Sequence, residues 1–338
     1  MPYNIQPIRE WSQVTRDQFE QEIRPLREPA VFRGLVPDWP LVRKGQQSSS
    51  AAVEYLKRLY SKKQIGTIKA GPEAEGRLFY NEQVTGYNFQ RIMQDMRVVL
   101  QELLDTEHDH SPPTIAMQAI TASDHLRGFD DDHPMPLLDR APPRLWIGNS
   151  AVIAPHYDLL DNIACVAVGR RRFTLFPPDQ LANLYVGPID NTPAGAPISM
   201  VDVNDPDFET YPRFAEALAH AQVAELEAGD AIFIPYMWWH GVEALERFNV
   251  LVNYWWDEHS SPELVPPRVA MMIARLAFKD MSEEQLGRWR TMFDRYIFNP
   301  ADDAMEHLPD HAKGLFGKMS GADVKKMRQV LGRMLLDD

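Results

Sequence analysis

The spacing of apolar and polar residues changes twice along the chain and divides it into three parts. Up to residue 113, short apolar runs alternate with stretches in which apolar residues recur every three or four positions. Between residues 114 and 260, nearly continuous apolar runs are separated by turn residues, a pattern typical of strands buried on both faces. Helical spacing then returns. We therefore expect N-terminal strands and helices (1–113) packing on a β core (114–260), followed by a C-terminal helical region (261–338).

Each part has its own predicted elements. The first part is expected to contain helices at 15–24, 48–60 and 89–104, a strand at 29–35, and strand and turn over 65–78. The core is expected to contain strands at 114–120, 144–148, 162–168, 172–176, 224–226, 231–234 and 249–255. The last part is expected to contain helices at 268–278, 282–296 and 322–336. The stretch 185–213, rich in proline, aspartate and asparagine, predicts a loop over the mouth of a two-sheet barrel, where it can contact a substrate.

Composition narrows the class of protein. With 44% hydrophobic and 25% charged residues among 338, the chain is expected to be globular. Its net charge of −13 opposes binding to a phosphate backbone, so nucleic acid is not an expected partner. The single cysteine, Cys165, excludes an intramolecular disulfide and a thiolate-rich zinc site. No stretch has the pattern of a signal peptide or a membrane span, so we expect a cytoplasmic protein that does not bind a membrane.

Two histidines and one aspartate are candidate metal ligands. His156 and Asp158 are two residues apart, and on an extended strand such residues point to the same side. His240 follows a distant predicted strand, and two strands of one barrel can bring it to the first pair. Together they would form the two-histidine, one-carboxylate face of non-haem Fe(II) oxygenases.

The spacing alone is weak evidence for a metal site. With 10 histidines and 48 acidic residues, chance produces about one histidine followed two places later by a carboxylate. The alternative is that His156 and Asp158 form a local hydrogen-bonded pair while His240 packs separately. A second histidine-rich stretch, 107–110, lies in a polar segment before two prolines, where solvated side chains are favoured over a metal site.

A set of short motifs resembles the cupin-like JmjC family, particularly the factor-inhibiting-HIF type of asparaginyl hydroxylase. The resemblance covers roughly residues 30–256 and is densest from 144 onward. It implies a double-stranded β-helix (cupin or jelly-roll) core, so the expected fold class is mainly β with helical additions at the N-terminal and C-terminal ends. The motifs are residues 146–148, 155–158, 173–180, 226–230, 233–240 and 252–255, together with Asn162 and Gly169.

The same resemblance implies an Fe(II)- and 2-oxoglutarate-dependent dioxygenase that hydroxylates a C–H bond. His156, Asp158 and His240 correspond to the iron ligands. Three protein ligands leave three positions of an octahedral iron open, two for a chelating 2-oxo acid and one for O2. The positions that correspond to the co-substrate pocket are Arg171, Asn162, Asn253 and Trp239.

Three residues depart from the pattern of the family around the co-substrate. Arg171 stands where the family has a lysine, Ile153 where the hydroxylase has a threonine, and Ala116 where it has a tyrosine. Arginine can bind a carboxylate through two parallel hydrogen bonds, and Gln118 or Arg144 is available to a rearranged pocket.

These departures keep two alternatives to the oxygenase open. One is a metal-binding cupin without oxygenase activity that acts as a binding or regulatory module. The other is a different metal-dependent cupin enzyme, such as an isomerase or a dioxygenase that uses no 2-oxo acid.

The expected substrate is a protein side chain or a small molecule, and no motif identifies it further. The C-terminal helices are rich in methionine, phenylalanine and leucine. They are expected either to pack on their own domain or to form a homodimer, as the corresponding region does in the family.

Overall fold

The computed structural model describes residues 5–139, 141–193, 195–257, 265–299 and 303–336. The chain divides into two compact units, residues 1–257 and 258–338. The boundary that we expected after residue 260 lies outside the described residues, so the three-part division of the chain remains a prediction.

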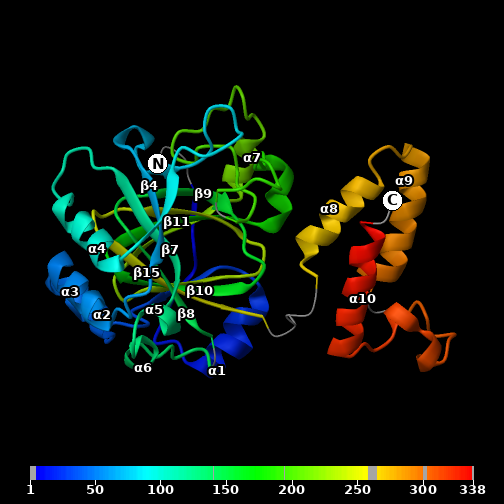
Figure 1. Ribbon diagram of the computed structural model, residues 1–338, viewed down its shortest axis with the longest axis horizontal. Helices are drawn as coiled ribbons and strands as arrows, with labels where there is room; N and C mark the ends of the chain where they lie inside the picture. The colour runs from blue at the N-terminus through cyan, green and yellow to red at the C-terminus, as the bar shows by residue number, and fades with distance from the viewer. Residues whose placement is uncertain (1–4, 140, 194, 258–264, 300–302, 337–338) are drawn as a thin grey trace. The chain divides into compact units, whose positions relative to one another are not determined.

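Two β-sheets face each other in the first unit (Figure 1). Residues before 114 supply strands to both sheets, and these strands are hydrogen-bonded parts of the barrel. The nine-stranded sheet has the order β2 (Glu10–Ser12), β3 (Ala30–Arg33), β13 (Ala231–Ile234), β10 (Asp161–Val168), β15 (Asn249–Trp256), β8 (Pro143–Gly148), β7 (Thr114–Thr121), β4 (Ile65–Ala70) and β6 (Gln90–Gln94). The six-stranded sheet has the order β1 (Gln6–Pro7), β12 (Gln222–Glu227), β11 (Arg170–Phe176), β14 (Trp239–Ala244), β9 (Val152–His156) and β5 (Arg77–Leu78).

The space between the sheets is filled by alternate residues of the central strands. Phe173 and Leu175 of β11 and Val242 of β14 share one buried cluster with Ala164 of β10 and Leu251 of β15. Because side chains alternate between the two faces of a strand, this cluster identifies which positions point into the barrel.

Helices cover the outer faces of the sheets. On the larger sheet, α2 (Pro40–Gln47), α3 (Ser49–Leu59) and α4 (Met96–Asp105) share a second buried cluster with outward-facing residues of β8, β10 and β15. Strand β10 is therefore buried along its whole length, which explains its apolar run over residues 163–168. On the smaller sheet, α7 (Phe214–Ala219) packs against Phe176 and Trp239. Three short helices complete the unit: α1 (Arg16–Gln18), α5 (Ala122–His125) and α6 (Phe129–Asp132).

All seven strands predicted for the core are present, and each end agrees within two residues. The helix expected at 89–104 is wrong in its first third. Residues Gln90–Gln94 form β6, which pairs with β4, and α4 begins only at Met96, where the Asp95 carboxylate accepts a hydrogen bond from the Arg97 N–H. Phe89 and Ile92 fit a strand as well as a helix, and the free edge of β4 favours the strand.

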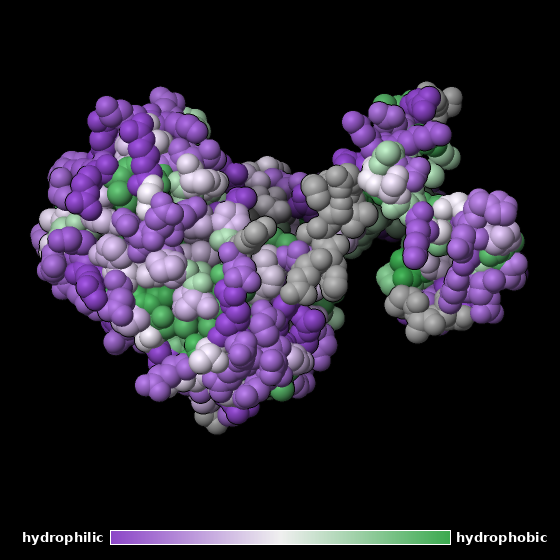
Figure 2. All heavy atoms as spheres, turned by 90° about the horizontal axis from the view of Figure 1, so that it is seen from below, coloured by the Kyte–Doolittle hydropathy of each residue, from purple (hydrophilic) through white to green (hydrophobic). Residues whose placement is uncertain are grey.

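The second unit consists of the three predicted helices α8 (Pro267–Ala277), α9 (Glu283–Phe293) and α10 (Gly321–Met334) with connecting turns. A capping box formed by Ser282 and Gln285 is present at the start of α9. None of the described residues in 265–299 and 303–336 is fully buried, and Figure 2 shows hydrophobic residues exposed among hydrophilic ones on this unit. In the part of the chain that the structure describes, no helix is both long and apolar enough to cross a membrane.

Candidate metal centre

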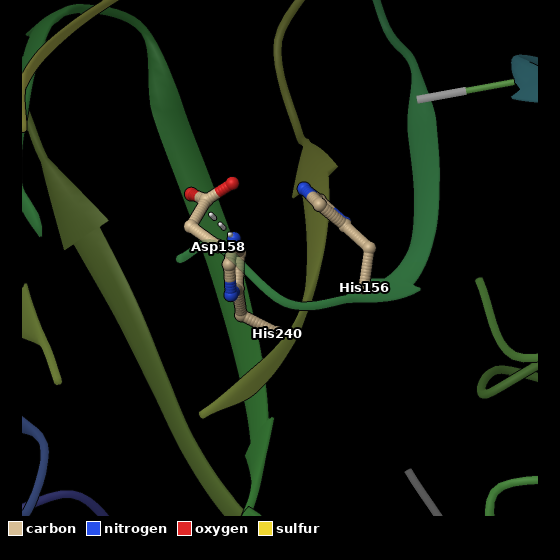
Figure 3. Close-up of side chains that lie close together, drawn as sticks. All are labelled: His156, Asp158 and His240. Carbon is tan, nitrogen blue, oxygen red and sulfur yellow. Dashed lines mark ion pairs between the residues drawn. The ribbon is translucent and has the colours of Figure 1, made fainter. Parts of the chain in front are cut away.

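Strands β9 and β14 bring the two histidines side by side. His156, at the end of β9, is paired with His240 near the start of β14, and their ring centroids are 4.3 Å apart. Asp158 follows β9 by two residues, and its Oδ2 lies 3.6 Å from His240 Nε2. The three side chains point toward one another (Figure 3), and one ligand atom from each lies within 4.8 Å of the others.

The backbone at this crossing is shaped by a proline and a glycine. The pairing of β9 with β14 shifts register between His240 and Val242, which marks a β-bulge. Pro155 has no N–H to donate, and a side chain added at Gly241 would come within 3.4 Å of the Pro155 ring. Bulges of this kind change the direction of side chains beside functional sites.

Both imidazole rings are held in the form that can coordinate a metal. His156 Nδ1 lies 3.0 Å from the carbonyl oxygen of Ala154, and His240 Nδ1 lies 3.0 Å from that of Trp238. A carbonyl oxygen only accepts hydrogen bonds, so each Nδ1 carries a hydrogen, and a ring in its neutral form then has a free lone pair on Nε2. Histidine ligands of metals are oriented by such bonds.

The electrostatics of the site also favour a neutral His240 ring. Burial lowers the pKa of His240, and the neighbouring His156 lowers it further, while the Asp158 carboxylate acts in the opposite direction. His240 is therefore an available metal ligand at neutral pH.

The donor set fits a divalent transition metal. Two imidazole nitrogens and one carboxylate oxygen on one face are the ligands that non-haem Fe(II) enzymes use. Ligand bonds of about 2.1 Å at right angles place neighbouring ligand atoms about 3 Å apart. The 3.6 Å separation of His240 Nε2 and Asp158 Oδ2 is close to that requirement.

Two buried polar groups near this site have no partner among the described residues. Asn253 donates from Nδ2 to Asn162 Oδ1 at 3.0 Å, but its own Oδ1 is buried without a hydrogen bond. Arg171 is 8% exposed, and its Nε is likewise buried without a hydrogen bond. Burial lowers the pKa of Arg171 to about 10, which still leaves it charged at neutral pH.

Both groups face the inside of the barrel. Arg171 alternates with the interior residues Phe173 and Leu175, and Asn253 lies two positions after the interior residue Leu251. Buried polar groups in proteins are normally paired, so these two indicate a polar ligand in the barrel.

The departures from the family pattern are apolar in the structure as well. Ile153 packs beside Ala116 in a small buried cluster, where neither can donate a hydrogen bond. Trp239, expected in the pocket wall, belongs to the cluster on the outer face of the smaller sheet, with its ring 4.9 Å from that of Tyr157. It therefore supports the ligand-bearing strands from behind instead of lining the interior.

The loop 185–213 lies beside the first histidine, and the hairpin that follows β5 is tied to it. The Ser199 N–H donates to the carbonyl oxygen of Pro155 at 2.8 Å. The Tyr80 hydroxyl donates to the backbone oxygen of Asn191 at 2.7 Å, and the Tyr87 hydroxyl donates to its side-chain oxygen at 2.7 Å. The loop is thus held next to the candidate metal ligands by neighbouring parts of the chain.

Comparison with protein families matches residues 16–262 to the model of the cupin-like domain. The chain belongs to this family. The jelly-roll fold expected from the motifs is thereby confirmed, and the ligand-bearing strands β9 and β14 lie within the matched region.

Several curated proteins are similar to this cupin-like chain. The tRNA wybutosine-synthesizing protein 5 of Gallus gallus is 25% identical over 261 residues, which are 72% of this chain and 74% of that protein. The HSPB1-associated protein 1 of Homo sapiens is 26% identical over 257 residues, covering 69% of this chain and 48% of that protein. The lysine-specific demethylase JMJ31 of Arabidopsis thaliana is 36% identical over 115 residues, covering 34% of this chain and 20% of that protein.

The groups that hold Asp158 in this cupin-like domain were not predicted from the sequence. The Trp255 Nε1–H donates to Asp158 Oδ2 at 3.1 Å, and the Met237 N–H donates to the Asp158 carbonyl oxygen at 3.1 Å. Asp161, buried nearby, accepts from the Tyr236 N–H and lies within 3.5 Å of Arg24 and Arg27. Trp255 lay within a recognised motif, but no spacing rule predicts these contacts across the fold.

Proposed function

We propose that this protein is an Fe(II)- and 2-oxoglutarate-dependent oxygenase in which His156, Asp158 and His240 hold the metal. The observation that carries the proposal is the combination of this ligand set with the buried, unpaired Arg171. A buried arginine without a partner is costly, and a dicarboxylate such as 2-oxoglutarate would supply the missing anion.

The pairing of β11 with β14 supports this role for Arg171. Leu175 is directly opposite His240 in the pairing of β11 with β14, and Arg171 is four residues earlier on β11. Four residues of a strand span about 13 Å, and an arginine side chain can cover about half of that distance. The remainder matches a five-carbon diacid whose other end reaches the metal.

The residues of the chain would bind and orient the reactants. When bound, Fe(II) with 2-oxoglutarate and O2 supplies the oxidising equivalent for hydroxylation of a C–H bond. Arg171 would hold the distal carboxylate through paired hydrogen bonds, and Asn253 Oδ1 and the Asn162 amide would contact polar atoms of the bound molecules. Trp146 and Trp255, with their rings 5.1 Å apart on neighbouring strands, would limit the access of water.

Anaerobic titration with Fe(II) and 2-oxoglutarate tests the proposal. We expect a visible charge-transfer band to form and to be lost in His240→Ala, together with conversion of 2-oxoglutarate to succinate when O2 is admitted. Absence of the band and of any affinity for either component would contradict the proposed function. The control is Trp239→Phe, because Trp239 lies on the face of β14 away from the ligands.

A second candidate is a metal-binding cupin without oxygenase activity. The apolar contact of Ile153 with Ala116 favours it, because that side of the pocket offers no hydroxyl group to a co-substrate. Metal binding without consumption of 2-oxoglutarate or O2 would support this candidate over the oxygenase.

For the substrate, we propose a protein side chain or a small molecule in preference to nucleic acid. The net charge of −13 is the reason, since a phosphate backbone would be repelled. Tight binding of bulk tRNA that weakens steeply with salt would contradict this assignment.

We also propose that the C-terminal unit joins two copies of the chain. Its three amphipathic helices have no fully buried residue of their own, while Leu276 is 75% exposed and Trp289 is 42% exposed. Covering such a surface with its counterpart from a second copy would supply the missing core. Leu276→Glu should convert a dimer into the 38.8 kDa monomer in sedimentation analysis. Val98→Glu is the control, because Val98 is 56% exposed on a helix of the barrel unit. This variant should leave the dimer intact.

A further inference from the structure

Asp158 is the ligand with the least support from regular secondary structure. Strand β9 ends at His156, and Asp158 lies in the irregular segment before β10, with its side chain 23% exposed. Its backbone is fixed by the bond from the Met237 N–H, but that bond leaves the carboxylate free to rotate. A carboxylate in such a position needs a separate contact to remain directed at the histidines.

Trp255 provides that contact. Its indole Nε1–H donates to Asp158 Oδ2 at 3.1 Å, which is the same oxygen that lies 3.6 Å from His240 Nε2. Trp255 belongs to β15 and is paired with Asn162 of β10, so the donor is fixed to the centre of the larger sheet. The bond therefore links the segment that carries Asp158 to a central strand of the larger sheet.

The indole ring is itself held in place from the neighbouring strand β8. The Trp146 ring meets it edge-on, with centroids 5.1 Å apart and planes at 82°. The Arg144 guanidinium carbon lies 5.7 Å from the centroid of the Trp255 ring. These contacts from one strand restrict rotation of the indole and hence the direction of its N–H.

A neutral donor is chemically suited to this place. A lysine or arginine would also orient the carboxylate, but its positive charge would compete with a divalent metal for the same anion. An indole N–H has no charge and no lone pair for the metal, so it can direct Asp158 while leaving its full negative charge available.

We propose that Trp255 is a positioning residue that fixes the Asp158 carboxylate for metal binding. The inference rests on the metal centre proposed above, and it adds a residue that acts through Asp158 without touching the metal. Groups that orient metal ligands in this way commonly change metal affinity by about 10- to 100-fold when removed.

Co(II) titration of three purified proteins, followed by visible absorption and calorimetry, tests the inference without any turnover. We expect Trp255→Phe to weaken Co(II) binding by about 10- to 100-fold. The matched control is Trp256→Phe, the same change at the next residue of β15, whose ring packs against Phe19 and Phe233 on the other face of the sheet, and it should change the affinity by less than about 3-fold. Equal affinities in wild type and Trp255→Phe would overturn the inference, and so would equal losses in the two variants, which would indicate general packing.

A second substitution separates the hydrogen bond from the shape of the ring. Benzothienylalanine, an isostere of tryptophan with sulfur in place of the N–H, can be incorporated at position 255 and should reproduce the loss of affinity with an unchanged circular dichroism spectrum. Retention of wild-type affinity by this protein would overturn the inference even if Trp255→Phe fails to fold. Failure of the wild-type protein to bind Co(II) at all would instead refute the metal centre, and the inference with it.

Discussion

Replacing Arg171 with methionine should make the metal-free protein more stable while removing its affinity for 2-oxoglutarate. Arg171 is buried inside the barrel, has no ion pair among the described residues, and has a pKa that burial lowers to about 10. At about 1.4 kcal/mol per pKa unit, keeping this charge in the folded protein costs up to about 3 kcal/mol. Methionine fills similar space without a charge, so Arg171→Met should recover about 1–3 kcal/mol.

The assay is thermal unfolding with and without ligand. A gain of this size should raise Tm by roughly 2–10 °C. With Mn(II) present, 2-oxoglutarate at 100 times its Kd should add about 2.7 kcal/mol of stability to the wild-type protein and nothing to Arg171→Met. Buried charges that reduce stability in this way are commonly retained for binding.

Arg172 provides the matched control on the same strand. It points away from the barrel interior and pairs with Glu225 at 2.7 Å and Glu243 at 2.8 Å. Arg172→Met should therefore lower stability by about 1 kcal/mol or less and keep the response to 2-oxoglutarate. If Arg171→Met lowered Tm by several degrees and still responded to the ligand, Arg171 would be a structural residue and would not bind 2-oxoglutarate.

Three further predictions concern the pH dependence, the loop and the support of Asp158. Burial lowers the pKa of His133 to about 4, and its neutral ring accepts a hydrogen bond from the Leu41 N–H. The free energy of unfolding should therefore fall by up to about 3 kcal/mol as the pH drops from 6.5 to 4. In His133→Gln, the denaturant midpoint should depend less on pH over this range. Tyr87→Phe removes the hydroxyl that holds the loop 185–213 at Asn191. KM for the substrate should therefore rise several-fold with little change in kcat. Unchanged kinetics together with an unchanged rate of proteolysis in the loop would contradict this role. Asp161→Asn keeps an acceptor for the Tyr236 N–H but removes the charge beside two arginines. The free energy of unfolding, measured with a chemical denaturant, should fall by about 1–3 kcal/mol. An unchanged free energy of unfolding would show that those ion pairs do not stabilise the fold.

The sequence predicted the strands of the core well because they are buried on both faces. β10 and β15 are apolar over most of their length, and such runs differ clearly from the turns around them. The strands that carry the histidines were not predicted. Pro155 in β9 and Gly241 in β14 are residues that usually exclude a strand, and here they form the bulge that directs the ligands. The sequence pattern that predicts strands was therefore weakest in the two strands whose irregular backbone carries the histidines.

The same contrast applies to the site itself. The ligand set could be proposed from His156, Asp158 and His240 because a family motif surrounds each of them. The bond from Trp255 to Asp158 joins residues 97 positions apart. Arg171 lacks a partner because, among the described residues, the fold brings no acidic side chain close enough to pair with it. Contacts of this kind follow from three-dimensional packing and have no pattern along the chain.

Side chains of β15 alternate between the inside and the outside of the barrel, and this limits where residues can be inserted or deleted. Asn253 and Trp255 both face inward because they are two residues apart, and a slip of β15 by one residue would turn both to the outside. Insertions or deletions in the short connection 245–248 should therefore abolish the site even where the fold tolerates them. The loop 185–213 lies outside the strands, so it can gain or lose residues without disturbing that register. Substrate preference can thus diverge through loop length while the central chemistry stays fixed.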